Sequence, residues 1–76
     1  MSHYQLDARR LLCPMPVIRA QDKIKILSVG DTLDVLCTDP GVKHDIPAWC
    51  EINGHEILGI VVAQREITVT IKVGCG

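Results

Sequence analysis

The chain has 76 residues, of which 47% are hydrophobic and 22% are charged, a balance typical of a folded protein rather than a disordered one. Its net charge of −1 offers no general attraction to nucleic acid or to a membrane surface. So short a chain predicts a single domain, residues 1–76, with a small core and no internal active-site cavity, so that any chemistry takes place at the surface.

The N-terminal residues and the cysteines indicate the compartment. No apolar run reaches the ~18 residues of a membrane helix, and Ser2-His3-Tyr4-Gln5 lacks the basic and apolar regions of a signal peptide. We therefore expect a cytoplasmic protein whose cysteines are free thiols. They form no Cys-x-x-Cys pair, which argues against a thioredoxin-like redox motif and a paired-cysteine zinc site. The four cysteines are Cys13, Cys37, Cys50 and Cys75.

The first half of the chain predicts a strand, a helix and a second strand. His3 to Ala8 is expected to form a short strand, and Arg9-Arg10-Leu11-Leu12 a loop. Pro14 and Pro16 indicate a helix start, because proline lacks the N–H that is unbonded in the first turn. Apolar residues at helical spacing continue this helix to about Ser28, before Gly30; they are Val17, Ala20, Ile24 and Leu27.

The next strand fixes the topology that we expect. Asp31 to Thr38 places Leu33, Val35 and Cys37 on one face. A strand, a helix and a strand in this order predict a parallel pair joined by a right-handed crossover. Crevices in such sheets lie at the carboxyl ends of the strands, where Cys13 would begin its helix.

A second helix and a hairpin complete the predicted fold. Val42, Ile46, Trp49 and Cys50 share a helical stripe, and Asn53-Gly54 ends the helix. Asp39 can cap this segment, whereas Pro47 predicts either a kink or a fresh helix start capped by Asp45.

The pattern predicts a hairpin of two strands, Glu56 to Ala63 and Ile67 to Val73, joined by Gln64-Arg65-Glu66. One face of the last strand is expected to be buried. The whole pattern is βαβαββ. It predicts an α/β two-layer sandwich, with two helices packed on one face of a four-stranded mixed sheet.

Cys13 is the candidate nucleophile. At or next to the N-cap, free backbone N–H groups and the helix dipole favour a thiolate over a thiol. Arg9 and Arg10 would lower the pKa of the thiol further if they turned toward it. The exposed prolines Pro14 and Pro16 would hold the cysteine at the surface. The competing interpretation is that Cys13 is an ordinary buried cysteine, although a proline-flanked helix start after a polar run is normally exposed.

Other polar clusters are weaker candidates. His3, His44 and His55 could join Cys37 or Cys50 at a metal, but no compact Cys/His motif is present, so we expect no metal site. Carboxylates could form an acid/base site, but each precedes a loop or a helix start, where capping explains an aspartate; they are Asp7, Asp39 and Asp45.

Cys13 also lies in a motif that resembles a known family. Leu11-Leu12-Cys13-Pro14-Met15-Pro16 is similar to the Cys-Pro-x-Pro signature of the TusA/SirA-like sulfur carrier proteins. Many relatives have glycine at the position of Arg10. Further segments resemble the same family across nearly the whole chain; they are Leu6-Asp7-Ala8, Asp39-Pro40, Asp45-Ile46-Pro47, Trp49-Cys50 and Gly54-His55.

The resemblance implies that Cys13 carries a persulfide sulfur between proteins. The chain would then be a sulfurtransferase that acts with partners and does not turn over alone. A cysteine desulfurase or a rhodanese would be the donor, and the acceptors would be other sulfurtransferase proteins. The pathway stays open between tRNA thiolation, molybdenum cofactor synthesis and sulfur oxidation. The resemblance implies no bound cofactor, and we expect no direct contact with nucleic acid or membrane.

Two questions stay open at this point. The alternative function is a non-catalytic interaction or regulatory module with an incidental cysteine, whose pKa would lie near the free value of about 8.5 rather than well below it. The tail Gly74-Cys75-Gly76 carries a second thiol that could resolve a persulfide on Cys13 by forming a disulfide.

Overall fold

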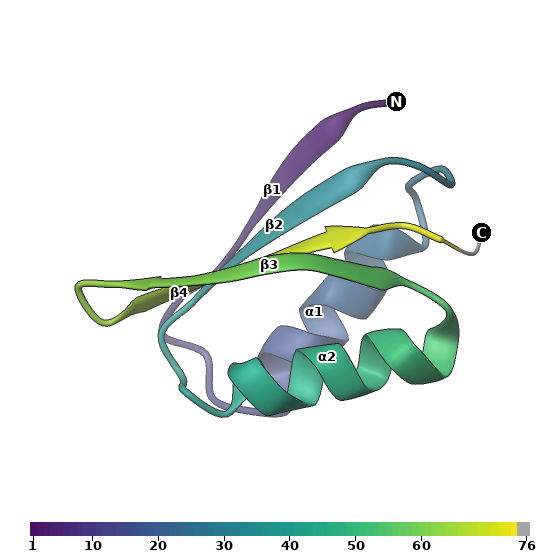
Figure 1. Ribbon diagram of the computed structural model, residues 1–76. Coiled ribbons are helices and arrows are strands. Elements are labelled where there is room, and N and C mark those ends of the chain that lie inside the picture. Colours follow the sequence, from purple (N-terminus) through teal and green to yellow (C-terminus); the bar gives the residue numbers. More distant parts are fainter. Residues whose placement is uncertain (75–76) are drawn as a thin grey trace.

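The computed structural model describes residues 1–74, and these form the predicted βαβαββ arrangement. Both helices lie against the same face of the sheet (Figure 1). The elements are β1 (His3–Ala8), α1 (Met15–Ile24), β2 (Thr32–Cys37), α2 (Val42–Asn53), β3 (Glu56–Ala63) and β4 (Glu66–Lys72). The α/β two-layer prediction is therefore confirmed. Over the described residues, neither helix is long and apolar enough to cross a membrane.

The sheet has the strand order β1-β2-β4-β3. β1 and β2 pair in parallel, with Ala8 opposite Cys37, while β4 pairs antiparallel with both β2 and β3. Because β1 and β2 are parallel neighbours, their carboxyl ends lie at the same edge of the sheet. The loops that follow them, one carrying Cys13 and the other Asp39, leave from that edge.

The core lies between the sheet and the helices and is aliphatic. Alternate residues of β2 and β4 are buried, as their period-2 pattern predicts, and they meet the apolar stripes of the helices. The buried hydrophobic residues include Leu33, Val35, Cys37, Ile67, Val69, Ile71 and Val73 from the strands and Ala20, Ile24, Val42, Ile46 and Cys50 from the helices.

Helix α1 ends at Ile24, earlier than Ser28 where the sequence pattern placed its end. The N–H groups of Ile26 and Leu27 bond to carbonyls three residues back, at Lys23 and Ile24. Such i→i−3 bonds tighten the chain into turns and end the regular α-helix. The turns lead to Gly30, whose φ of 95° suits a residue without a Cβ.

Helix α2 runs through Pro47 without a fresh start, so the second helix start proposed at Asp45 is wrong. Gly41 is the N-cap residue and no side chain caps the helix, so Asp39 is not its N-cap either. Pro47 costs one bond, to the carbonyl of Lys43. Lys43 is exposed, so water can reach this turn. Gly54 ends the helix with φ 79°, as predicted.

We predict that packing of β4 against the helices dominates stability. Ile71 is 0% exposed and Ile26 is 74% exposed. Ile71→Val should lower the free energy of unfolding by about 0.5–1.5 kcal/mol, because it leaves a methyl-sized cavity. Ile26→Val, which removes the same methylene from the surface, should change it by less than about 0.5 kcal/mol. Urea denaturation monitored by circular dichroism measures both, and equal effects would contradict the burial described above.

Candidate functional site

Cys13 lies in the β1–α1 loop, immediately before Pro14, the N-cap residue of α1. Its side chain is half-buried and packs against the edge of the hydrophobic core. It faces the start of α2: a Cβ placed on Gly41 would lie 3.3 Å from the Cys13 sulfur, closer than ordinary van der Waals contact. The site therefore joins two loops that are far apart in sequence, with the sulfur against a glycine.

The carboxylate of Asp39 connects these two loops. Its Oδ2 accepts a 2.8 Å hydrogen bond from the backbone N–H of Cys13, and its Oδ1 accepts one of 3.0 Å from Gly41. These two backbone donors lower the pKa of Asp39, the bond from Cys13 contributing most. Neither of these bonds caps helix α2. The sequence also did not predict that a side chain would accept a hydrogen bond from the backbone of Cys13. The sequence signals were that Asp39 lies just beyond β2 and that Asp39-Pro40 is one of the segments that resemble the family.

The thiol of Cys13 is held in its protonated form. Desolvation of the sulfur is the largest cause, and together with the nearby carboxylates of Asp45 and Asp39 it raises the pKa of the thiol to about 12. The expectation of a lowered pKa is therefore wrong for the free chain. By the criterion of pKa alone, Cys13 is not a preactivated thiolate.

The helix start fails to stabilise a thiolate because of its prolines. Pro14 and Pro16 carry no N–H, and the N–H of Met15 is already bonded to the Leu12 carbonyl at 2.9 Å. None of the three residues Pro14, Met15 and Pro16 therefore offers the sulfur a free backbone N–H. The same residues that correctly predicted the helix start remove the anion-binding groups such a start usually provides.

The two prolines also differ in exposure. Pro14 is exposed, whereas Pro16 is buried with the core-facing residues of α1. Pro16 therefore anchors the helix start to the core, and only Pro14 is an exposed neighbour of Cys13. The expectation of two exposed prolines is wrong for Pro16.

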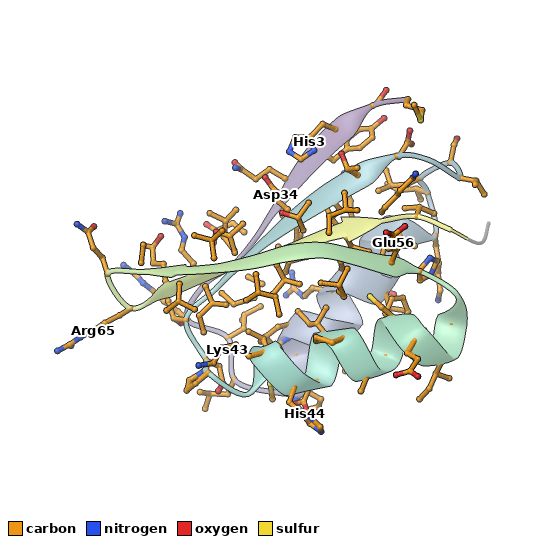
Figure 2. The ribbon with its side chains drawn as sticks, viewed as in Figure 1. His3, Asp34, Lys43, His44, Glu56 and Arg65 are labelled. Carbon is orange, nitrogen blue, oxygen red and sulfur yellow. The ribbon has the colours of Figure 1, made fainter. Side chains whose placement is uncertain are left out.

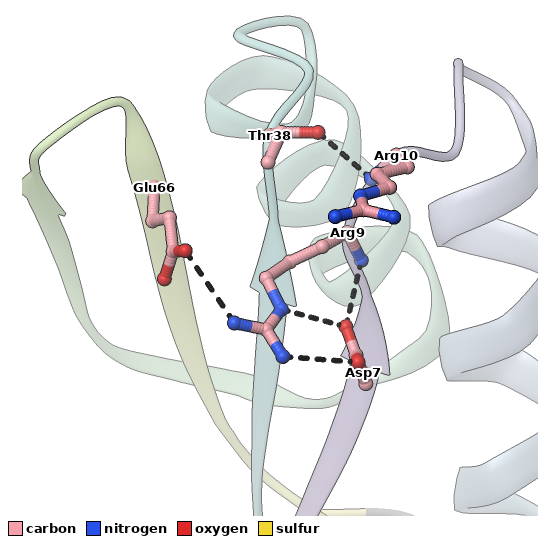
Figure 3. A pocket seen from close by; sticks show the side chains of 5 residues that line it. All are labelled: Asp7, Arg9, Arg10, Thr38 and Glu66. Atoms are coloured by element: carbon pink, nitrogen blue, oxygen red, sulfur yellow. Dashed lines mark hydrogen bonds and ion pairs between the residues drawn. The ribbon is translucent and has the colours of Figure 1, made fainter.

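Arg9 is engaged away from the sulfur. Its guanidinium bonds both oxygens of Asp7, at 2.9 and 3.1 Å, and reaches Glu66 at 3.4 Å (Figure 3). This pairing lowers the pKa of Asp7 to about 2, chiefly through the side-chain hydrogen bond from Arg9. Arg9 therefore does not contribute to the shift of the Cys13 pKa.

Arg10 lies beside Arg9 and takes an unusual backbone conformation. Its φ is 69°, in the left-handed region that glycine enters without strain. Its N–H donates to Thr38 Oγ1 at 2.9 Å. Arg10 lines a surface pocket of about 360 Å³, together with Asp7, Arg9, Thr38 and Glu66 (Figure 3).

The other cysteines that the structure describes are buried. Cys37 and Cys50 lie in the core, and burial raises the pKa of each to about 11. Cys75 falls outside the described residues, so its expected role in the tail remains a prediction. Among the described cysteines, Cys13 alone is partly exposed.

The histidines do not assemble with the cysteines. His3 lies on β1 and bonds Asp34, whereas His44 projects from α2 away from the sheet (Figure 2). The ring of His55 stacks on Trp49, with centroids 5.2 Å apart. Within residues 1–74, no three His, Cys, Asp or Glu side chains converge in a way that could hold a metal ion.

Comparison with known proteins identifies the family to which this chain belongs. Residues 4–73 match the family described as "Sulfurtransferase TusA". The "Sulfur carrier protein TusA" of Pseudomonas entomophila is 44% identical over 54 residues, which cover 71% of this chain and 68% of that protein. The "Putative sulfur carrier protein YrkF" of Bacillus subtilis is 43% identical over 62 residues. That match covers 82% of this chain but spans only 33% of the Bacillus protein.

A solved structure shows the same architecture. The crystal structure of the SirA-like protein from Desulfitobacterium hafniense superposes with a TM-score of 0.81, at 26% sequence identity. The match covers 93% of this chain and 97% of that one. Since the family match extends over nearly all of the chain, this protein belongs to the TusA sulfurtransferase family of sulfur carrier proteins.

Proposed function

We propose that Cys13 is the residue that carries sulfur, accepting it as a persulfide from a donor protein and passing it to an acceptor. The observation that supports this most directly is exposure, because Cys37 and Cys50 are buried and Cys13 lies at the surface edge of the core. Its backbone is held by the Asp39 bond, which fixes where the sulfur is presented. Membership of a sulfur carrier family supplies the class of chemistry.

The transfer step is a thiol exchange. The Cys13 sulfur, after losing its proton, attacks the outer sulfur of a donor persulfide R–S–SH. The new bond joins Cys13 Sγ to that outer sulfur, the S–S bond of the donor breaks, and the donor leaves as the thiolate R–S⁻, which takes up a proton. Cys13–SH and R–S–SH thus become Cys13–S–SH and R–SH, with no net oxidation. The reverse sequence on an acceptor thiol delivers the sulfur.

The partners in this proposal are proteins. A cysteine desulfurase or a rhodanese is the donor class, since both hold persulfide sulfur on a cysteine. The acceptors are other sulfurtransferase proteins, in tRNA thiolation, molybdenum cofactor synthesis or sulfur oxidation. Exposed arginines beside the Cys13 loop, Arg9 and Arg10, are the side chains that we assign to partner contact.

We predict that Cys13→Ser folds normally and accepts no sulfur. The protein is incubated with a cysteine desulfurase and cysteine, and intact mass spectrometry with peptide mapping locates any added sulfur. The wild type should gain sulfur on the Cys13 peptide, removable by reductant. The substitution changes one half-exposed atom, so the circular dichroism spectrum and unfolding midpoint should stay close to those of the wild type.

Cys75→Ser is the matched control, because it removes a thiol by the same substitution. It should gain sulfur on Cys13 as the wild type does. Sulfur on the Cys13→Ser protein would overturn the assignment of Cys13. If the wild type took no sulfur from the desulfurase or from a rhodanese, the non-catalytic interaction module would become the better interpretation.

We predict that Arg10→Gly slows sulfur loading from a protein donor by about threefold to tenfold at low ionic strength, because it removes a charge that guides docking. The difference should shrink in 0.5 M salt, which screens exposed charges. Glycine is chosen because the φ of 69° does not strain it. Loading is followed by mass spectrometry over time.

Lys25→Ala provides the charge-matched control for Arg10→Gly. Lys25 is an exposed cation that follows the last residue of α1, far along the helix from Cys13. It should leave the loading rate unchanged. An equal decrease in both variants would show that only total charge matters, and would remove Arg10 from the docking surface.

A further inference from the structure

The sulfur of Cys13 and two carboxylates border the same small space. A Cβ built on Gly41 would lie 3.3 Å from Cys13 Sγ, 3.4 Å from Asp39 Oδ1 and 3.7 Å from Asp45 Oδ2. The groups come from three segments, namely the β1–α1 loop, the β2–α2 loop and the first turn of α2. A Cβ at this position would therefore push the Cys13 sulfur back by a few tenths of an ångström.

The two carboxylates have no cation to neutralise them. Over residues 1–74, no Lys, Arg or His forms an ion pair with Asp39 or Asp45. Asp39 accepts two backbone N–H bonds, which fix its position but carry no full charge. Arg9, which precedes Cys13 in the β1–α1 loop, is bound to Asp7 and Glu66. The sulfur therefore faces negative charge from the β2–α2 loop and from the first turn of α2.

We infer that Asp45, together with Asp39, adds to the effect of burial in keeping Cys13 protonated and weakly nucleophilic in the free carrier, so that the sulfur donor must supply the group that activates it. This inference rests on the proposed role of Cys13 in sulfur transfer and adds a specific regulation to it. Asp45 is thus a positioning residue that acts through the charge it presents to the thiol. Asp39 contributes charge as well, but it is also needed to hold the loop.

The carboxylates cannot themselves take the proton. An ordinary carboxyl group, with a pKa of about 3.9, binds a proton far more weakly than a thiol does. An anion beside a thiol therefore opposes its ionisation, and the proton must leave to a base on the donor. A cationic side chain of the donor that paired with Asp45 would help by cancelling the opposing charge.

Such restraint suits a carrier that moves between partners. Only the thiolate reacts rapidly with disulfides and oxidants. A protonated Cys13 is therefore spared unproductive reactions while the carrier is free. Binding of the donor would therefore both deliver the sulfur and allow Cys13 to lose its proton.

The test measures the reactivity of Cys13 itself. The wild type and Asp45→Asn are treated with iodoacetamide from pH 6 to pH 11, and peptide mass spectrometry quantifies alkylation at Cys13 alone. The whole range lies below the pKa of the wild-type thiol, so a pKa that falls by about one unit in Asp45→Asn should make alkylation faster at every pH. The thiolate fraction at pH 8 then rises about tenfold, which the weaker nucleophilicity of a less basic thiolate reduces to about a threefold gain in rate.

Asp22→Asn is the matched control. Asp22 is an exposed carboxylate on α1 that pairs with Lys25, and it plays no part in the shift of the Cys13 pKa. Its profile should coincide with that of the wild type. Asp45→Ser serves as a second charge-removing variant, with folding checked by circular dichroism, in case the asparagine variant is unstable.

The outcomes separate this inference from the proposed function. An unchanged or upward-shifted profile in a folded Asp45 variant would overturn the restraint, whatever the sulfur-loading result. A downward shift combined with no sulfur loading would support the restraint and overturn the carrier role of Cys13. A merely structural role for Asp45 would change the unfolding midpoint without moving the profile of the folded protein.

Discussion

Two backbone N–H groups, from Cys13 and Gly41, meet on one carboxylate, that of Asp39. This arrangement depends on the parallel pairing of β1 and β2, which brings both following loops to one edge of the sheet. Hydrogen bonds to a charged acceptor are stronger than neutral ones, so the cysteine loop is fixed at its reactive residue. The position of the sulfur, its contact with Gly41 and its electrostatic surroundings all follow from this link.

The same link decides how the cysteine behaves. A carboxylate that holds the loop also places negative charge beside the sulfur, and Asp45 adds a second charge from the first turn of α2. The N-cap residue Pro14 and the helical residue Pro16 supply no N–H that would offset this charge. The carboxylate of Asp39 thus has two effects, because it fixes the position of the thiol and also opposes its ionisation. A carrier built in this way relies on its partner for activation.

Much of the fold could be read from the residues. The alternation in β2 and β4, the apolar stripe of α1 and the glycine after α2 each reflect a local rule, and all were confirmed. The exceptions were local as well. α1 ended early because its last bonds tightened to i→i−3. Pro47 stayed inside α2 because one lost hydrogen bond near the exposed Lys43 costs less than restarting a helix that is packed on the core.

The sequence by itself determined the βαβαββ order, the placement of Cys13 before a helix and the family motif, since each depends on residues close together in the chain. Only the tertiary structure decided the charge around the sulfur. Asp39 lies 26 residues from Cys13, and no local pattern says which side chain will reach a given atom across a sheet edge. The Arg9 side chain, near Cys13 in sequence, turns toward Asp7 and Glu66 instead, because pairing follows distance in space rather than distance along the chain.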